Sequence, residues 1–290
     1  MIVMQLMGGL GNQMFQCALG LHLSMLKGSP LRLDVSDCWA NPARPFALNG
    51  FKVNVVAASP GELRRFPPPR EWNPYIAPLM TRLVPYYRRR YIKERNFPRF
   101  DPNIFRCGRD AYLSGYWQSE KYFLPIASEI RRLFAPRKPL SPGSAEFARR
   151  IEGTNAVSIH VRRGDYVTNP AARAFHGLCP PEYYSAAIAY IRTRVQNPRF
   201  FVFSDDAAVG AEFAGMPDVE VVRSDPDRPD YEDMWLMRLC RHHIVANSSF
   251  SWWGAWLNPR EDKIVVAPRQ WFQSPALDTR DLVPETWVRI

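Results

Sequence analysis

Apolar and polar positions at the start of the chain alternate in a way that predicts a strand, a helix and a second strand. Residues 1–6 form a short apolar run, and from residue 12 to 27 apolar side chains recur at helical spacing before Gly28. Residues 31–35 form another apolar run. This β-loop-α-β pattern is typical of the beginning of a doubly wound α/β domain.

The second half of the chain shows the same alternation. It predicts strands at 156–161, 200–204, 219–222, 242–247 and 263–267, and helices at 180–195, 230–240 and 249–257. Strands that alternate with helices favour a mainly parallel sheet covered on both faces.

The middle of the chain is less regular. Residues 40–110 have no clear period, residues 116–134 predict a helix, and the Pro/Ser/Gly-rich segment 136–144 predicts a linker. We therefore expect an α/β protein with two domains, 1–140 and 141–290.

Composition removes several classes of protein from consideration. No run of about 18 apolar residues predicts a membrane span. The five cysteines are scattered and form no CxxC pair, so neither a disulfide framework nor a zinc site is indicated. The N-terminus has no basic region before its apolar run, which favours a cytoplasmic protein over a secreted one.

Positive charge is concentrated in one segment. The net charge is +10, and residues 61–100 hold ten Lys or Arg against three Glu, with aromatic residues and prolines among them. Such a segment is typical of a surface for an anionic partner, which can be nucleic acid, phospholipid headgroups or a phosphorylated substrate. A solvated, loop-rich surface is the alternative.

Glycines follow the first predicted strand, where a backbone can approach a phosphate closely. Gly9 and Gly11 match two glycines of the dinucleotide fingerprint, but a methionine stands at its third small position. Asp34 ends the second strand, where a ribose-binding acid would lie. The side-chain amides of Asn12 and Gln13 suit hydroxyls and phosphate oxygens. A tight turn without a ligand is the alternative.

A basic motif follows the strand at 156–161. His160 and Arg162 share one face of the extended chain, and Arg163 and Asp165 come directly afterwards. A guanidinium group can clamp a phosphate with two hydrogen bonds, and the carboxylate can orient an arginine or cap the turn. The alternative is a surface ion-pair cluster.

Polar residues also end the strand at 200–204. Ser204, Asp205 and Asp206 could bind ribose hydroxyls, the N–H edge of a base or a divalent cation, and they could also cap a following helix.

A serine-rich segment begins the helix predicted at 249–257. Asn247, Ser248, Ser249, Phe250 and Ser251 place hydroxyl and backbone N–H groups where a phosphate can bind. We expect the three tryptophans of this helix to pack in the core.

Taken together, GGLGNQMFQ, HVRRGDY, FSDD and NSSFSWWGAWL resemble the bacterial α-1,2-fucosyltransferases of glycosyltransferase family 11. The resemblance implies a GT-B-type fold, with two Rossmann-like domains facing a central cleft. The N-terminal domain would bind the acceptor and the C-terminal domain GDP-fucose. It also implies inverting, metal-independent transfer of L-fucose to the 2-hydroxyl of a galactose-terminated oligosaccharide, such as O-antigen or capsule, with no cofactor and no nucleic-acid partner.

The resemblance also implies roles for individual residues. Arg162 would contact the donor β-phosphate, Arg163 would support it, and Asn12 would reach the diphosphate or the reacting sugar. His160 and either Asp205 or Asp206 would face guanine or ribose. Further donor contacts are implied for Gly9, Gly11, Gln13, Ser204, Asn247, Ser248, Ser249, Phe250 and Ser251.

The general base that must take the acceptor's proton stays open. Asp165, His160 and Asp34 are candidates, and late proton loss to solvent or to a phosphate oxygen is another route. Two further interpretations of the chain are an NAD(P)-dependent oxidoreductase and a non-catalytic protein that binds anions or glycans. As an additional hypothesis, the segment 61–100 holds the enzyme at the anionic cytoplasmic face of a membrane.

Overall fold

The computed structural model describes residues 1–68, 84–164, 169–206, 208–213, 215–222 and 228–290, and it divides into two compact units. Unit 1 comprises Met1–Leu133 and Thr279–Leu282, and unit 2 comprises Phe134–Asp278 and Val283–Ile290. The division lies before residue 140 because Phe134 packs with its ring centroid 5.3 Å from that of Trp253 in unit 2. The short segment 279–282 belongs to unit 1, where Arg99 and Lys121 bind the carboxylate of Asp281 at 2.9 and 2.8 Å.

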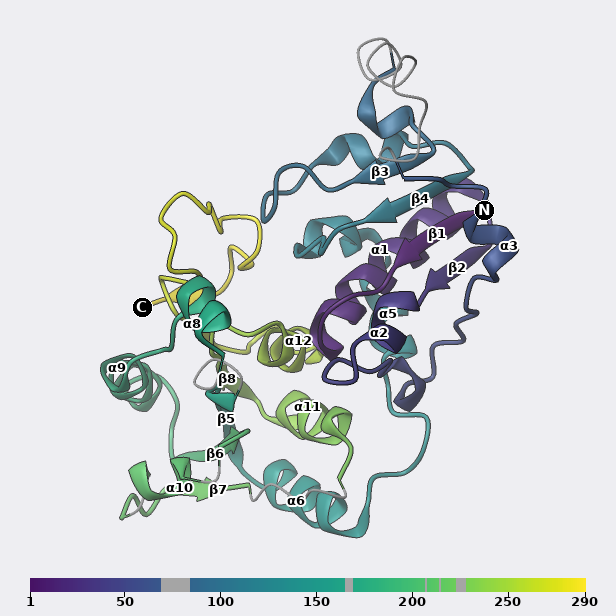
Figure 1. Ribbon diagram of the computed structural model, residues 1–290. Coiled ribbons are helices and arrows are strands. Elements are labelled where there is room, and N and C mark those ends of the chain that lie inside the picture. Colours follow the sequence, from purple (N-terminus) through teal and green to yellow (C-terminus); the bar gives the residue numbers. More distant parts are fainter. Residues whose placement is uncertain (69–83, 165–168, 207, 214, 223–227) are drawn as a thin grey trace. The chain divides into compact units, whose positions relative to one another are not determined.

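Unit 1 contains a four-stranded parallel sheet in the order β2-β1-β4-β3 (Figure 1). The strands are β1 (Ile2–Gln5), β2 (Leu31–Asp34), β3 (Tyr91–Lys93) and β4 (Ala111–Ser114). Helix α1 (Leu10–Lys27) connects β1 to β2 and ends at Gly28, whose φ of 56° lies in the left-handed region. The predicted β-loop-α-β beginning is therefore confirmed.

The sequence pattern missed much of the remainder of unit 1. The helix predicted over 116–134 is wrong for most of its length: 3-10 turns η5 (Glu120–Tyr122) and η6 (Leu124–Ile126) precede a short α5 (Ala127–Leu133). Pro125 lies in the second of these turns, and its ring cannot be accommodated inside an α-helix. The other short elements are α2 (Ser36–Ala40), η1 (Leu48–Gly50), α3 (Pro60–Leu63), η3 (Tyr86–Arg88) and η4 (Pro102–Arg106).

Unit 2 contains a six-stranded parallel sheet in the order β10-β9-β8-β5-β6-β7. The strands are β5 (Asn155–Val161), β6 (Pro198–Ser204), β7 (Val219–Val221), β8 (His242–Ile244), β9 (Val265–Ala267) and β10 (Val288–Arg289). The helices are α6 (Pro142–Glu152), α8 (Pro170–His176), α9 (Pro181–Arg192), α10 (Val209–Glu212), α11 (Asp230–Leu239) and α12 (Ser249–Leu257). Helix α6 begins inside the predicted linker, because Ser141 caps its first turn.

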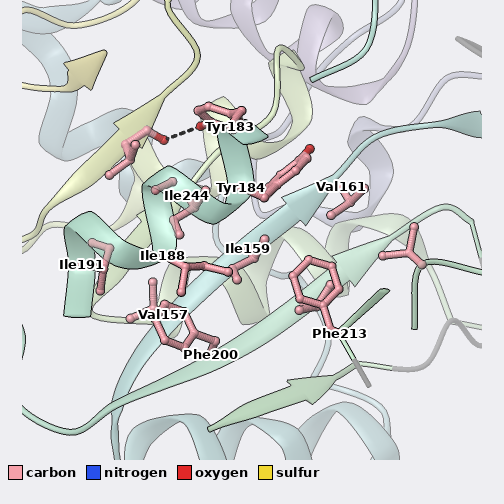
Figure 2. Packing of buried hydrophobic residues seen from close by; sticks show 14 of the residues in the cluster. Val157, Ile159, Val161, Tyr183, Tyr184, Ile188, Ile191, Phe200, Phe213 and Ile244 are labelled. Atoms are coloured by element: carbon pink, nitrogen blue, oxygen red, sulfur yellow. Dashed lines mark hydrogen bonds between the residues drawn. The ribbon is translucent and has the colours of Figure 1, made fainter. Parts of the chain in front are cut away.

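Both faces of the unit 2 sheet are covered, as the alternation predicted. Figure 2 shows the apolar face of α9 packed on β5 and β6, with Ile188 against Ile159. The hydroxyl of Tyr183 donates to the backbone oxygen of Val266 at 3.1 Å. On the opposite face, Phe201 and Phe203 pack with residues of α6 and α11. Because successive strand residues point to opposite faces, one apolar run supplies both cores.

Two consequences bear on function. Since all strands of a sheet run in parallel, the residues that follow β5, β6 and β8 lie at one edge of unit 2, and those that follow β1, β3 and β4 lie at one edge of unit 1. None of the helices in the described ranges is long and apolar enough to span a bilayer.

Candidate functional site

Arg162 follows β5 directly and is held in place by a carboxylate from the neighbouring strand. Its Nη1 lies 2.8 Å from Oδ2 of Asp205, and the backbone N–H of Arg163 donates to Oδ1 of the same carboxylate at 2.8 Å. The side chains of Arg162 and Asp205 are 22% and 26% exposed. The guanidinium group is thus fixed at the sheet edge while part of it still faces solvent.

The residues around Asp205 build the turn after β6. Ser204 donates its hydroxyl hydrogen to the backbone oxygen of Val161 at 2.9 Å and accepts from the N–H of Asp206 at 3.0 Å. Asp206 accepts from the N–H of Ala208 at 2.9 Å. Within the described ranges, no group of three or more His, Cys, Asp or Glu could hold a metal ion. Asp205 thus orients Arg162, whereas the alternative of capping the following helix is wrong, because the N-cap of α10 is Ala208 and no side chain caps it.

Arg163 turns toward a different partner. Both oxygens of Glu212 in α10 bind its guanidinium, with Nη2 2.8 Å from Oε2, and Asp206 lies 3.7 Å away. The hydrogen bond with Glu212 raises the pKa of Arg163 further above its usual range. Both arginines therefore have a carboxylate partner at the sheet edge, and Arg163 is bound in addition by Glu212 of α10.

His160 is a buried side chain and not an exposed base. It is 4% exposed, and its ring centroid lies 5.6 Å from that of Phe250. Burial, aided by the charge of Arg162, lowers the pKa of His160 to about 3. Among the described residues, nothing hydrogen-bonds to its Nδ1. His160 is therefore a poor candidate for the general base, because an imidazole with so low a pKa binds the acceptor's proton only weakly.

The start of α12 lies beside this position. Ser248 caps the helix by accepting from the N–H of Phe250 at 3.3 Å, and Ser251 is 1% exposed with its hydroxyl 3.4 Å from the backbone oxygen of Ser248. Ser249 and Phe250 are partly exposed. The helix thus buries the side chain of Ser251, and the donor contacts implied for the serines of this motif stay predictions.

The three tryptophans of α12 belong to the core, as expected. Trp252, Trp253 and Trp256 are each at most 2% exposed, and the rings of Trp252 and Trp256 stack with centroids 5.9 Å apart. They anchor the helix whose first turn faces the sheet edge.

Asn247 has a structural role that its sequence position did not reveal. Its Nδ2 donates to the backbone oxygens of His176 at 2.8 Å and Trp271 at 3.3 Å, and the residue is 3% exposed. The amide thus ties two loops to the end of β8, and the donor contact implied for Asn247 stays a prediction. Asn247 also lines a cavity of about 340 Å³ together with Arg269.

In unit 1 the glycine loop differs from the fingerprint. Gly8 adopts a φ of 76°, Gly9 is the N-cap of α1, and Gly11 lies buried inside that helix. A Cβ on Gly8 would lie 2.5 Å from Nδ2 of Asn12, so only glycine leaves room for that amide. Gly8, which is not one of the two glycines matched to the fingerprint, is therefore the glycine of this loop with a left-handed backbone.

Gln13 is fully buried, and its amide stabilises the loop. Its Nε2 donates to the backbone oxygens of Gly8 at 3.0 Å and Pro45 at 2.8 Å, and its Oε1 accepts from the N–H of Ala47 at 3.0 Å. The amide of Gln13 therefore has a structural role, and the donor contact implied for Gln13 stays a prediction.

Asn12 differs from its neighbour because it remains partly exposed. Its Oδ1 accepts a hydrogen bond of 2.7 Å from Nε2 of Gln118, which is 9% exposed. This bond fixes the orientation of the Asn12 amide and directs Nδ2 away from Gln118. The sequence contained no signal for this pair, whose members are 106 positions apart.

The two other candidate bases have different outcomes. Asp34 is 8% exposed; its Oδ1 accepts from the hydroxyl of Ser36 at 2.6 Å and its Oδ2 from the hydroxyl of Tyr112 at 2.6 Å. The burial of Asp34, with a hydroxyl on each carboxylate oxygen, opposes a role as base. Asp165 lies outside the described residues.

Comparisons with known proteins add to this geometry. The family model Glycosyl transferase family 11 matches residues 86–290. Two Escherichia coli proteins are each 35% identical: an alpha-1,2-colitosyltransferase, over 100% of this chain and 98% of that protein, and the O-antigen biosynthesis glycosyltransferase WbnK, over 98% and 99%. A Sus scrofa galactoside alpha-(1,2)-fucosyltransferase is 26% identical over 86% of this chain and 67% of that protein.

A solved structure supports the fold. NodZ alpha-1,6-fucosyltransferase, soaked with GDP-fucose, matches 91% of this chain and 94% of its own with a TM-score of 0.50 and 18% sequence identity. With the two parallel sheets, this likeness identifies an α/β fold of GT-B type, built from two Rossmann-like units.

Proposed function

This chain belongs to glycosyl transferase family 11 and is a glycosyltransferase, and we propose that it moves L-fucose from GDP-β-L-fucose to the 2-hydroxyl of a terminal β-galactoside, forming an α-1,2 linkage. The names of the pig relative and of the NodZ structure support fucose, GDP and a galactoside. The name of the second Escherichia coli relative supports an O-antigen type of glycan as the acceptor.

The observation that carries this proposal is the cationic position at the edge of unit 2. When the bond between C1 of the sugar and GDP breaks, negative charge grows on the β-phosphate and positive charge on the sugar ring. Arg162, held by Asp205, and the first turn of α12 supply fixed positive charge for an anion at that edge. We propose that Asn12 also takes part in the transfer, by binding the diphosphate or the reacting sugar.

We propose that transfer needs no metal ion. A guanidinium group and a helix N-terminus can together neutralise the leaving diphosphate, and the two carboxylates at this edge bind arginines and backbone N–H groups. Full activity in excess EDTA is the expected result. A loss of activity that Mg²⁺ or Mn²⁺ restores would overturn this part of the proposal.

Colitose is a second candidate for the transferred sugar, because an Escherichia coli relative that matches this whole chain is an alpha-1,2-colitosyltransferase. Colitose is fucose without its 3-hydroxyl. A site that hydrogen-bonds this hydroxyl can reject the deoxy sugar by a factor on the order of 10⁴, whereas a site that leaves it in solvent accepts both sugars.

A competition assay separates these outcomes. Equal amounts of GDP-fucose and GDP-colitose are offered with a panel of β-galactosides, and the product linkage is read by NMR. We expect α-1,2-fucosylated product in excess. Preferential transfer of colitose would select the second candidate, and no transfer from either donor would overturn the proposed function.

A further inference from the structure

Glu94 follows β3 directly and is seated against the turn that follows β4. Its Oε2 accepts from the backbone N–H of Tyr116 at 2.6 Å, and its Oε1 accepts from the N–H of Trp117 at 3.1 Å. Gly115 has a φ of 157°, and a Cβ there would lie 2.4 Å from Cβ of Glu94. The carboxylate is thus fixed by two amides and by a close backbone approach, yet the residue remains partly exposed.

The same turn organises the rest of this edge. Gln118 holds Asn12, as described above, and Nε2 of the buried Gln16 donates to the backbone oxygen of Gly115 at 3.0 Å. Gln16 also accepts from the N–H of Met7 at 3.0 Å. One hydrogen-bonded network therefore joins the carboxyl ends of β1, β3 and β4, and it includes both Glu94 and Asn12.

The earlier candidates for the base that lie in the described ranges, His160 and Asp34, are less suitable than Glu94. His160 is buried, and Asp34 binds two hydroxyls. Asp37 in α2 is another acid that follows a strand of this sheet, and it is exposed on a short helix. Glu94 alone of these combines fixed geometry with partial exposure.

We propose that Glu94 is the general base of the transfer reaction, an inference that rests on the proposed function. Its carboxylate accepts the proton of the acceptor hydroxyl while the hydroxyl oxygen bonds to C1 of the sugar. The bond from C1 to the β-phosphate oxygen breaks, and GDP leaves with the electron pair. The protonated Glu94 then releases its proton to water, so each turnover yields the glycoside, GDP and one proton.

The electrostatic setting supports this geometry. Burial raises the pKa of Glu94 to about 7, against the opposing effect of the two backbone amides. Tyr116 and Tyr122 are titratable groups of the described ranges that sense its charge, and Asp37 and Arg44 in turn act on Tyr116. A carboxylate that titrates near neutrality is a better proton acceptor than an ordinary one and is still ionised just above pH 7.

The test is the pH dependence of fucose transfer in the full-length enzyme. In wild type, kcat/KM should fall as pH drops below about 7. In Glu94→Gln, kcat/KM at pH 8 should be lower by about 100-fold or more and this acidic limb should vanish. Asp37→Asn is the matched control on the same edge, with the limb and the rate unchanged. A melting-temperature rise on adding GDP confirms that each variant is folded and binds the donor product.

Each outcome decides the inference. The inference is overturned if Glu94→Gln keeps the acidic limb of the kcat/KM profile and more than a tenth of the wild-type kcat/KM. It is also overturned if Asp37→Asn or Asp165→Asn removes that limb instead. Should Glu94→Gln fail to fold, Glu94→Asp decides: we expect the limb with kcat at least ten-fold lower, and a wild-type kcat overturns the idea. Absence of transfer by wild type is a failure of the proposed function itself.

Discussion

Replacing Arg162 by alanine tests the proposed donor position most directly. The substitution removes a guanidinium group whose Nη1 lies 2.8 Å from Oδ2 of Asp205 and leaves that carboxylate without its ion-pair partner. Because both side chains are more than a fifth exposed, water can solvate the carboxylate, and the cost to the free energy of unfolding should be at most about 1 kcal/mol. The variant should therefore fold, and its kinetics can be interpreted.

The expected loss of activity follows from the charge that develops on the β-phosphate. Removing one preorganised donor to a developing oxyanion costs about 2.7–4 kcal/mol, and a guanidinium group can supply two parallel hydrogen bonds. We expect kcat/KM to fall by about 10³-fold, or about 4 kcal/mol. Arg162→Lys keeps the charge without the planar fork, so it should recover only part of this loss.

The neighbouring arginine provides the control. Arg163 is bound by both oxygens of Glu212, so Arg163→Ala should lower kcat/KM by less than about ten-fold. The assay is transfer from GDP-fucose at varied donor concentration, with GDP affinity measured by calorimetry. An Arg162→Ala enzyme with more than about a tenth of wild-type kcat/KM, a loss below about 1.4 kcal/mol, would refute the assigned role. A larger loss in Arg163→Ala would do so as well.

Four further predictions concern other parts of the molecule. Gln13→Ala removes three buried hydrogen bonds to the loop backbone and should lower the free energy of unfolding by about 2–3 kcal/mol in urea titrations; no change would contradict a structural role. Gln118→Leu releases the amide of Asn12 and should lower kcat while GDP affinity stays constant, whereas a matching loss of affinity would point to general unfolding. Because the pKa of His160 is lowered from 6.5 to about 3, its contribution to the free energy of unfolding should be fully present above pH 6.5 and be lost as pH falls toward 3. The free energy of unfolding should fall less steeply with pH in His160→Gln, and equal slopes in variant and wild type would refute this. Neutralising arginines 88–90 should weaken co-sedimentation with anionic vesicles by about 1 kcal/mol per exposed charge, and unchanged binding would end the membrane hypothesis.

Five strands and three helices of unit 2, and the edge that carries the candidate site, could be predicted from the sequence, whereas α6, α8 and α10 were not predicted. Strands β5 to β9 have three to seven residues and lie in apolar runs, and polar motifs follow β5, β6 and β8, so local order along the chain is enough to predict them. Strand β10, with two residues, was not predicted either. Arg162 and Asp205 come together because β5 and β6 are parallel neighbours paired in register, Val161 with Ser204. The doubly wound pattern already predicts that strand ends of this kind meet at one edge.

Part of unit 1 was less accessible to sequence analysis because its short strands β3 and β4 lie in the irregular, proline- and arginine-rich segment 40–110 or directly after it. Strands β3 and β4 have three and four residues, too few for a period to appear among the prolines and arginines around them. Of the buried aromatic residues at 117, 122 and 123, the first precedes the 3-10 turns, the second ends η5 and the third lies between η5 and η6, so their intervals do not match those of an α-helix.

The sequence by itself determined which chemical groups follow the strands, whereas the tertiary structure decided which of them can still act. Gln13, Asn247 and Asp34 carry the right groups in the right motifs, but remote backbone and hydroxyl partners bind those groups. A buried polar group must be hydrogen-bonded, and its partner can lie anywhere in the sequence. For the same reason only the fold shows that Gly115, Tyr116 and Trp117 hold Glu94, a carboxylate that no motif contains, at the edge where Asn12 lies.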